Sequence, residues 1–442
     1  MGRSARLKGR ADWWSQPGPS DSRVRVLMVT SLVAALGMGV FATISLLFLT
    51  GPLHLPVGQV GLALTVSGLA GQLAAVPAGR LADRGRCGSV MAASLLFRGM
   101  TTLAVVFAVH SFAAFALAAS LNAAAYQAWT SGRAAAVGQI AGTQGAPMLS
   151  ARLRTAGNLG MSVGIPMAGV ALAVGTAGAY RAALCVTAAS YLVAAVFVAR
   201  LQLSLDRSGS IAPVPAARRA RPWRDPGYLA ITMLSAVTSL QYVLLDYALP
   251  LWIVDHTSAP RWTVAATGVV NTAVVVALQV PLSRGAGRVR QAAWMTAASG
   301  VAVAVACALV AAAAAPGAVA ACALLGLGTL ALSLGEVWQT AGGNGLSYGL
   351  APDGTSGEYQ GFYSMGQGVA LAAGPSVMSC TVLRVGVSGW LAVGAMLAGC
   401  GLLAPLLVSR RSRAGGRIPA PRRPAQPQPA LADGSSTDVY NS

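Results

Sequence analysis

Residues 76–86 read Val-Pro-Ala-Gly-Arg-Leu-Ala-Asp-Arg-Gly-Arg. This short polar stretch separates two apolar runs, residues 57–79 and 89–109, each long enough to cross a bilayer. Asp83 stands just beyond the first run, so its carboxylate can face the positive N-terminus of another helix. The stretch therefore predicts a tight turn at one membrane face, with a carboxylate that can tie two helices together.

The composition of the whole chain indicates a membrane protein. Of its 442 residues, 55% are hydrophobic and 10% are charged, with a mean hydropathy of +0.62. A soluble protein of this length could not bury so much apolar surface, so lipid is the expected solvent for most of it. The net charge of +19 comes from basic residues in short loops and tails, a pattern that argues against a nucleic-acid partner.

Apolar stretches of about 20 residues, the length of a membrane-spanning helix, recur twelve times. They are residues 25–50, 57–79, 89–109, 112–133, 155–175, 179–200, 228–252, 262–283, 291–313, 317–341, 358–381 and 386–408. The predicted domains are a cytoplasmic basic arm (1–22), an N-terminal six-helix bundle (23–200), a cytoplasmic central loop (201–227), a C-terminal six-helix bundle (228–408) and a disordered cytoplasmic tail (409–442). Because the arm is polar, we expect no cleavable signal peptide.

The distribution of basic residues predicts the orientation. With the N-terminus inside, 27 of the 31 Lys and Arg residues fall on the inner face and three on the outer one, which predicts two cytoplasmic termini. A composition rich in Ala, Gly and Arg with almost no Lys suggests a bacterium with a GC-rich genome. We therefore expect a multi-pass protein of a bacterial plasma membrane.

The chain also matches itself locally. A shift of 204 residues lays Arg80, Arg84 and Arg86 on arginines 284, 288 and 290. Such a match predicts two halves built alike. The second copy has Gly287 in place of Asp83, so only the first loop keeps the acidic contact.

The loop residues Gly79, Leu81, Ala82, Asp83, Arg84, Gly85 and Arg86 resemble the signature of the major facilitator superfamily between its second and third membrane helices. The copy here is one residue shorter between Arg84 and Gly85, and has Cys87 where a basic residue is usual. The resemblance implies an all-α membrane protein of twelve transmembrane helices in two six-helix pseudo-repeats, which transports by alternating access. Residues assigned to a gate between the two lobes are Gly79, Asp83, Arg84, Arg86, Arg133 and Glu358. A role of the loop arginines in topology alone stays open.

The predicted fifth helix carries a strip of small residues. Its motif residues are Arg154, Asn158, Gly160, Gly164 and Pro166. The strip resembles the Gly-x-x-x-Gly-Pro motif of drug:proton antiporters, with Ile165 inserted before the proline. The arginine that those antiporters carry in the outer half of the fourth helix is missing here. Ordinary close helix packing is the alternative for the strip.

Few ionisable residues fall inside the apolar runs, and such residues usually line a cavity. By the resemblance, helices one, four, seven and ten line it. The predicted cavity residues are Asp246, Glu336, Asn122, Tyr126, Gln241, Tyr242 and Gln339. The two acids are expected to carry protons or contact a polar or cationic substrate, and a fixed gate bridge is the alternative for Glu336. Arg98 is expected to extend to the inner surface, so the sequence places no arginine at the centre.

The sequence contains no Gly-x-x-x-x-Gly-Lys-Ser/Thr loop, so energy should come from an ion gradient or from the substrate's own gradient. The leading interpretation is an exporter of small amphiphilic molecules, drugs or secondary metabolites, by proton antiport. The alternative is a proton-coupled importer or a uniporter of a small metabolite. An enzyme is not expected, since no nucleophile or metal constellation and no CxxC pair occurs. The expected partners of a monomer are the bilayer, a small-molecule substrate and the proton, with no cofactor.

Overall fold

The computed structural model describes residues 21–50, 57–107, 112–208, 221–315 and 317–413, and these residues are almost entirely helical, with no strand. The helices are α2 (Ser22–Thr50), α3 (Val57–Leu81), α4 (Cys87–Phe107), α5 (Phe112–Val174), α6 (Ala177–Ser208), α7 (Pro226–Thr238), α8 (Leu240–Val243), α9 (Leu249–His256), α10 (Trp262–Leu282), α11 (Val289–Ala312), α12 (Ala318–Leu350), α13 (Ser356–Met378) and α14 (Val387–Arg413). Most of the predicted N-terminal arm and most of the predicted tail lie outside the described residues.

Nine helical stretches among the described residues are long and apolar enough to cross a membrane. Two of them, Val66–Phe107 with 42 residues and Ala113–Val174 with 62, are long enough for two crossings each, since one crossing takes about 20 residues. α13, with 23 residues, is also long enough for one crossing. It is not among the nine because its Gly, Ser and Gln residues make it less apolar. The prediction of an all-helical protein with twelve crossings is confirmed.

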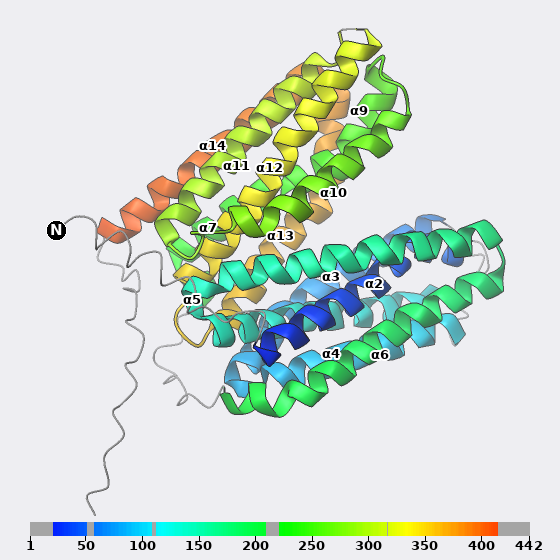
Figure 1. The fold of residues 1–442 in the computed structure, drawn as a ribbon, viewed down its shortest axis with the longest axis vertical. Coiled ribbons are helices and arrows are strands. Elements are labelled where there is room, and N and C mark those ends of the chain that lie inside the picture. The colour runs from blue at the N-terminus through cyan, green and yellow to red at the C-terminus, as the bar shows by residue number, and fades with distance from the viewer. Residues whose placement is uncertain (1–20, 51–56, 108–111, 209–220, 316, 414–442) are drawn as a thin grey trace, which may run out of the picture.

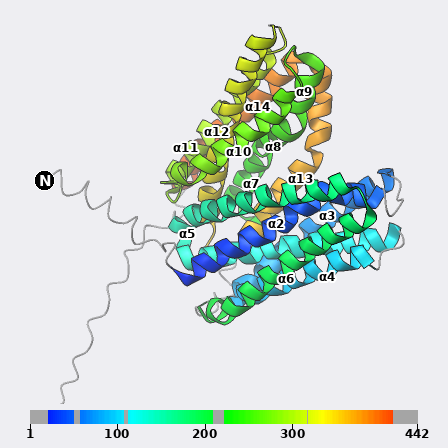
Figure 2. The ribbon, with the colours of Figure 1, turned by 45° about the vertical axis from the view of Figure 1, so that its right-hand side comes forward.

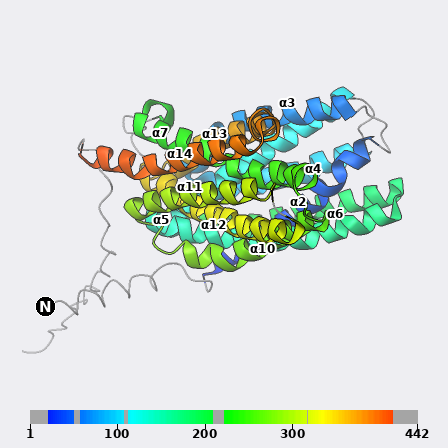
Figure 3. The same ribbon diagram turned by 90° about the horizontal axis from the view of Figure 1, so that it is seen from above.

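The helices form two bundles, α2–α6 and α7–α14, which are arranged as a V (Figures 1 and 2). The bundles meet at the end where α2 begins and α14 ends, and they diverge toward the opposite end. We call these the terminal end and the distal end. Figure 3 shows the same helices from above, with α3 and α13 side by side where the bundles touch.

Glycines with positive φ mark the sharp turns of the first bundle. A π-helical turn, Ala82–Arg86, joins α3 to α4, and Gly85 in it has φ 82°. α5 contains two of the predicted helices, 112–133 and 155–175, which the structure extends until they meet at Gly142, with φ 62°. The predicted ends were wrong here because the residues between them are mostly good helix formers.

The ends of other helices also differ from the prediction. α12 continues to Leu350 instead of ending near 341, although its last turns are rich in glycine. A Cβ on Gly342 would lie 2.7 Å from the carbonyl oxygen of Ala292 in α11, so this glycine permits close packing instead of ending the helix. The predicted central loop, 201–227, is shorter, because α6 extends to Ser208 and α7 begins at Pro226.

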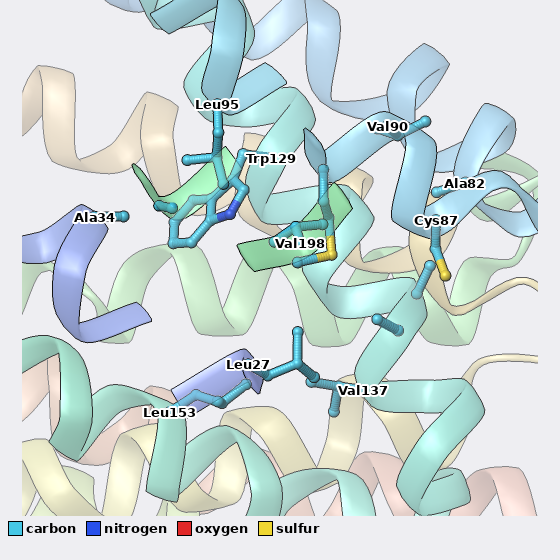
Figure 4. Packing of buried hydrophobic residues seen from close by; sticks show 14 of the residues in the cluster. Leu27, Ala34, Ala82, Cys87, Val90, Leu95, Trp129, Val137, Leu153 and Val198 are labelled. Atoms are coloured by element: carbon cyan, nitrogen blue, oxygen red, sulfur yellow. The ribbon is translucent and has the colours of Figure 1, made fainter. Parts of the chain in front are cut away.

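Each bundle has its own apolar core. In the first bundle, Leu27, Leu95, Trp129 and Val198 come from four helices and are buried together (Figure 4). In the second bundle, the core includes the two tryptophans Trp252 and Trp390, whose rings meet edge to face at 5.9 Å. The first core also contacts Tyr348 of α12, and apart from such contacts each bundle can move as one body.

The glycines of the predicted fifth-helix motif pack α5 against α2. A Cβ at Gly160 would overlap the carbonyl oxygen of Leu32, and one at Gly164 would overlap that of Leu36. Glycine therefore lets two backbones touch inside the first bundle. Pro166 lies exposed within the same helix, which continues past it.

We expect Gly160→Ala to lower the melting temperature of the purified protein, because overpacking costs about 1–3 kcal/mol. The matched control is Gly169→Ala in the same helix, where no atom lies within 4 Å of a built Cβ. Thermal unfolding followed by tryptophan fluorescence measures both variants. Equal melting temperatures for the two would contradict the close-packing role.

Candidate functional site

Asp83 joins the two bundles at the terminal end. Its carboxylate oxygens accept hydrogen bonds from the backbone N–H groups of Gly357 and Glu358, both at 2.7 Å. These groups belong to the first turn of α13, where the free N–H groups carry partial positive charge. A loop of the first bundle thus caps a helix of the second.

Close backbone contact and an ion pair surround this cap. A Cβ at Gly79 would overlap the carbonyl group of Gly357, so α3 and α13 touch without side chains between them. Arg80 Nε lies 2.9 Å from Glu358 Oε1, and its guanidinium lies 4.9 Å from the ring centroid of Trp223. We call Gly79, Arg80, Asp83, Gly357 and Glu358 the terminal gate.

Among the loop arginines, Arg80 forms the ion pair that crosses between the bundles, and the gate assignments of Arg84 and Arg86 stay predictions. Both are exposed on the turn beyond α3. Arg80 lies in the last turn of α3, next to α13, and this explains why it reaches Glu358.

A cavity of about 900 Å³ lies between the two bundles. Its walls come from α2, α3, α4 and α5 on one side and from the α7–α9 segment, α12 and α13 on the other. Of the predicted cavity residues, Tyr126, Tyr242, Asp246 and Gln339 line it. Tyr242 Oη donates to Gln339 Oε1 at 3.3 Å, and Asp246 lies on the π-helical turn Leu244–Ala248 with its side chain exposed to the cavity.

An ion pair connects the bundles at the cavity wall. Arg154 Nη2 of α5 donates to Glu336 Oε1 of α12 at 2.5 Å. The other carboxylate oxygen accepts from Asn271 Nδ2 at 3.0 Å, and the Arg154 guanidinium lies 5.6 Å from the ring centroid of Tyr242. Glu336 is only 7% exposed, whereas the Arg154 side chain is 33% exposed, so removing the arginine charge would leave a buried carboxylate without a counter-charge.

Two predicted cavity residues contact other helices instead. Asn122 Nδ2 donates to Thr101 Oγ1 at 2.9 Å and to the carbonyl oxygen of Arg98 at 3.2 Å, so its amide binds α4. Gln241 is 2% exposed and packs beside Gly335 of α12. Tyr242, the next residue, lies about 100° further around the helix and faces the cavity.

The cavity contains arginines that the sequence did not place there. Arg98 is 6% exposed and donates from Nη2 to Tyr191 Oη at 2.9 Å, so the prediction that it extends to the surface was wrong. Its guanidinium lies 4.1 Å from the ring centroid of Tyr191 and 5.0 Å from that of Tyr126. Arg133, predicted at the gate, lines the cavity with its guanidinium 4.4 Å from the ring centroid of Trp129.

The motif residues Arg154 and Asn158 also line the cavity. The sequence assigned both to a packing strip, whose glycines Gly160 and Gly164 pack against α2. Arg154 lies one residue before the predicted run 155–175, so the rule for charges inside apolar runs did not single it out as a cavity residue.

The sequence pattern described as Major Facilitator Superfamily matches residues 27–375. Solved structures show the same fold. A bacterial homologue of the iron transporter ferroportin, in an outward-facing state, has a TM-score of 0.70 and 16% identity, covering 88% of this chain and 99% of that one. The human organic anion transporter MFSD10 has a TM-score of 0.61 and 17% identity, covering 88% and 100%. The proton:xylose symporter XylE has a TM-score of 0.63 and 12% identity, covering 88% and 95%. No curated protein matches the chain.

Proposed function

Since the chain belongs to the major facilitator superfamily, we propose that it exports small amphiphilic molecules in exchange for protons, by alternating access. The observation that carries this proposal is the cavity between two bundles that are joined at one end and separate at the other. A site at the interface of two rigid lobes, with contacts that can break on one side, is what alternating access requires. We propose residues 23–200 and 228–408 as these lobes.

The orientation is part of the proposal. The terminal end carries the basic loops, so by the positive-inside rule it faces the cytoplasm of a bacterial cell. The terminal gate would then close the cytoplasmic side, and the structure would be the outward-facing state. Breaking this gate and closing the distal end would expose the cavity to the cytoplasm.

Proton coupling rests on the ion pair at the cavity wall. Protonation of the Glu336 carboxylate removes its charge, so the attraction that holds α12 to Arg154 in the other lobe is lost. Asp246, on the second lobe and facing the same cavity, offers a further carboxylate for the proton. One proton could therefore loosen a contact between the lobes.

An importer or uniporter of a small metabolite is the second candidate. From the sequence, a charged substrate was not expected, because no arginine was predicted at the centre of the cavity. In the structure, Arg98, Arg133 and Arg154 line the cavity. The structural neighbours are described as a homologue of an iron transporter, an organic anion transporter and a proton:xylose symporter, so the fold does not determine the substrate.

A susceptibility screen in a host without its own efflux pumps tests the direction. Expression is expected to raise resistance to some amphiphilic compounds, and in proteoliposomes those compounds should drive proton flux in the opposite direction. Expression of the Glu336→Gln variant is the control, because it shows what expressing the membrane protein does to the cells without the proposed proton exchange. Increased sensitivity together with compound uptake would favour the importer.

A further inference from the structure

We propose that the first lobe binds the anionic group of an amphiphilic organic anion on a ladder made of Arg98, Tyr126, Trp129 and Arg133. This inference rests on the proposed function and assigns its substrate class. The anionic group is a carboxylate, sulfonate or phosphate, and the rest of the molecule is flat and apolar.

The ladder is continuous along the cavity wall. The Arg98 guanidinium lies 5.0 Å from the centroid of the Tyr126 ring, which lies 6.2 Å from that of Trp129. The Arg133 guanidinium lies 4.4 Å from the Trp129 centroid. The three α5 residues are spaced at i, i+3 and i+7, so they share one face of the helix, and all four residues line the cavity.

The charges that face the cavity do not balance. Its charged lining residues are Arg98, Arg133, Arg154 and Asp246. Arg154 is paired with Glu336. The remaining charged groups are the guanidinium groups of Arg98 and Arg133 in the first lobe and the carboxylate of Asp246 in the second. The first lobe thus presents cations for which the described ion pairs provide no carboxylate.

Arg98 is the strongest single indication. It is 6% exposed, its Nη2 binds only a neutral tyrosine hydroxyl, and its Nε has no hydrogen-bond partner among the described residues. A buried guanidinium without a counter-charge is costly, and an anionic ligand would supply both the charge and the acceptor. An organic cation would meet repulsion at the same place.

The aromatic members of the ladder select a flat ligand. Trp129 and Tyr126 put their rings between the two cations, and ring systems favour offset or edge contacts with other rings. An anion with a conjugated ring can therefore place its charged group on an arginine and its ring against Tyr126 or Trp129.

Two dyes with the same tricyclic xanthene ring test the charge preference, fluorescein as the anion and rhodamine 123 as the cation. Binding to the purified full chain in nanodiscs is measured by fluorescence anisotropy, without any gradient. We expect fluorescein to bind, and Arg98→Gln or Arg133→Gln each to weaken it by about 10- to 100-fold, as expected for hydrogen bonds to charged groups. Arg98→Lys should retain part of the affinity.

The control variant is Arg290→Gln, at an exposed position at the terminal end of α11, which should leave fluorescein affinity unchanged. Tighter binding of rhodamine 123, failure of both dyes to bind, or fluorescein binding that both cavity variants leave intact would overturn the proposal. Fluorescein binding without any proton-coupled flux would instead contradict only the proposed antiport. Proton-driven export of rhodamine 123 alone would contradict only the substrate class.

Discussion

Glu336→Gln should lower substrate-coupled proton flux by more than about tenfold while the protein still folds into its two bundles. The glutamine keeps the shape of the side chain but can neither bind the transported proton nor form an ion pair with Arg154. Removing one partner of a fully buried pair costs about 3–5 kcal/mol, and the cost is smaller here because the Arg154 side chain is 33% exposed. A reduced cost is still comparable with the few kcal/mol that usually separate two conformations of a protein.

Flux is measured in proteoliposomes with a compound found in the susceptibility screen, and ligand binding is measured on the same preparation. Glu336→Asp, which keeps the charge, should retain part of the flux. The double variant Arg154→Gln with Glu336→Gln should regain stability over either single variant, because it leaves no unpaired charge. If Glu336→Gln and Asp246→Asn both keep full pH-dependent transport, neither acid carries the proton.

Asp83→Asn should shift the protein away from the closed terminal end by roughly 100-fold or more. The carboxylate accepts two hydrogen bonds from backbone N–H groups, and hydrogen bonds to a charged group contribute about 1.5–3 kcal/mol each. An asparagine would direct its own N–H₂ group toward one of these donors. Hydrogen exchange of the peptide that contains Gly357 and Glu358 measures the loss directly.

Asp206→Asn is the matched control. Asp206 accepts hydrogen bonds from the N–H of Gly88 at 2.8 Å and from Ser89 Oγ at 2.6 Å, so it also caps a helix N-terminus, but within the first bundle. It should speed exchange at the start of α4 and leave the start of α13 protected. Equal protection of α13 in wild type and Asp83→Asn would contradict the role of Asp83.

The fold could be predicted from the sequence because lipid imposes simple rules: a spanning helix needs an apolar run of fixed length, and basic residues gather in loops on one side. The position of Asp83 beyond an apolar run also predicted a contact with a helix N-terminus. That the helix is α13 could not be predicted, since the two contacts lie 274 and 275 residues apart in the chain.

The cavity was harder to predict than the fold. Arg154 and Glu336 lie 182 residues apart, and no local spacing links two such positions. Arg98 was read as a surface residue because a long basic side chain near a helix end usually extends to the interface. The structure instead shows it bound to Tyr191, and helix periodicity alone does not reveal which neighbour offers such a partner.

In the proposed transport cycle, two rigid lobes rock about the cavity, and the terminal gate is closed when the distal end is open. Distances between spin labels test it in a variant without native cysteines. One pair is placed at Arg86 and Arg288, exposed at the terminal end, and another at Val174 and Val319, exposed at the distal end. From wild type to Asp83→Asn, we expect a longer terminal distance and a shorter distal one. Two distances that lengthen together, or that both stay unchanged, would contradict it.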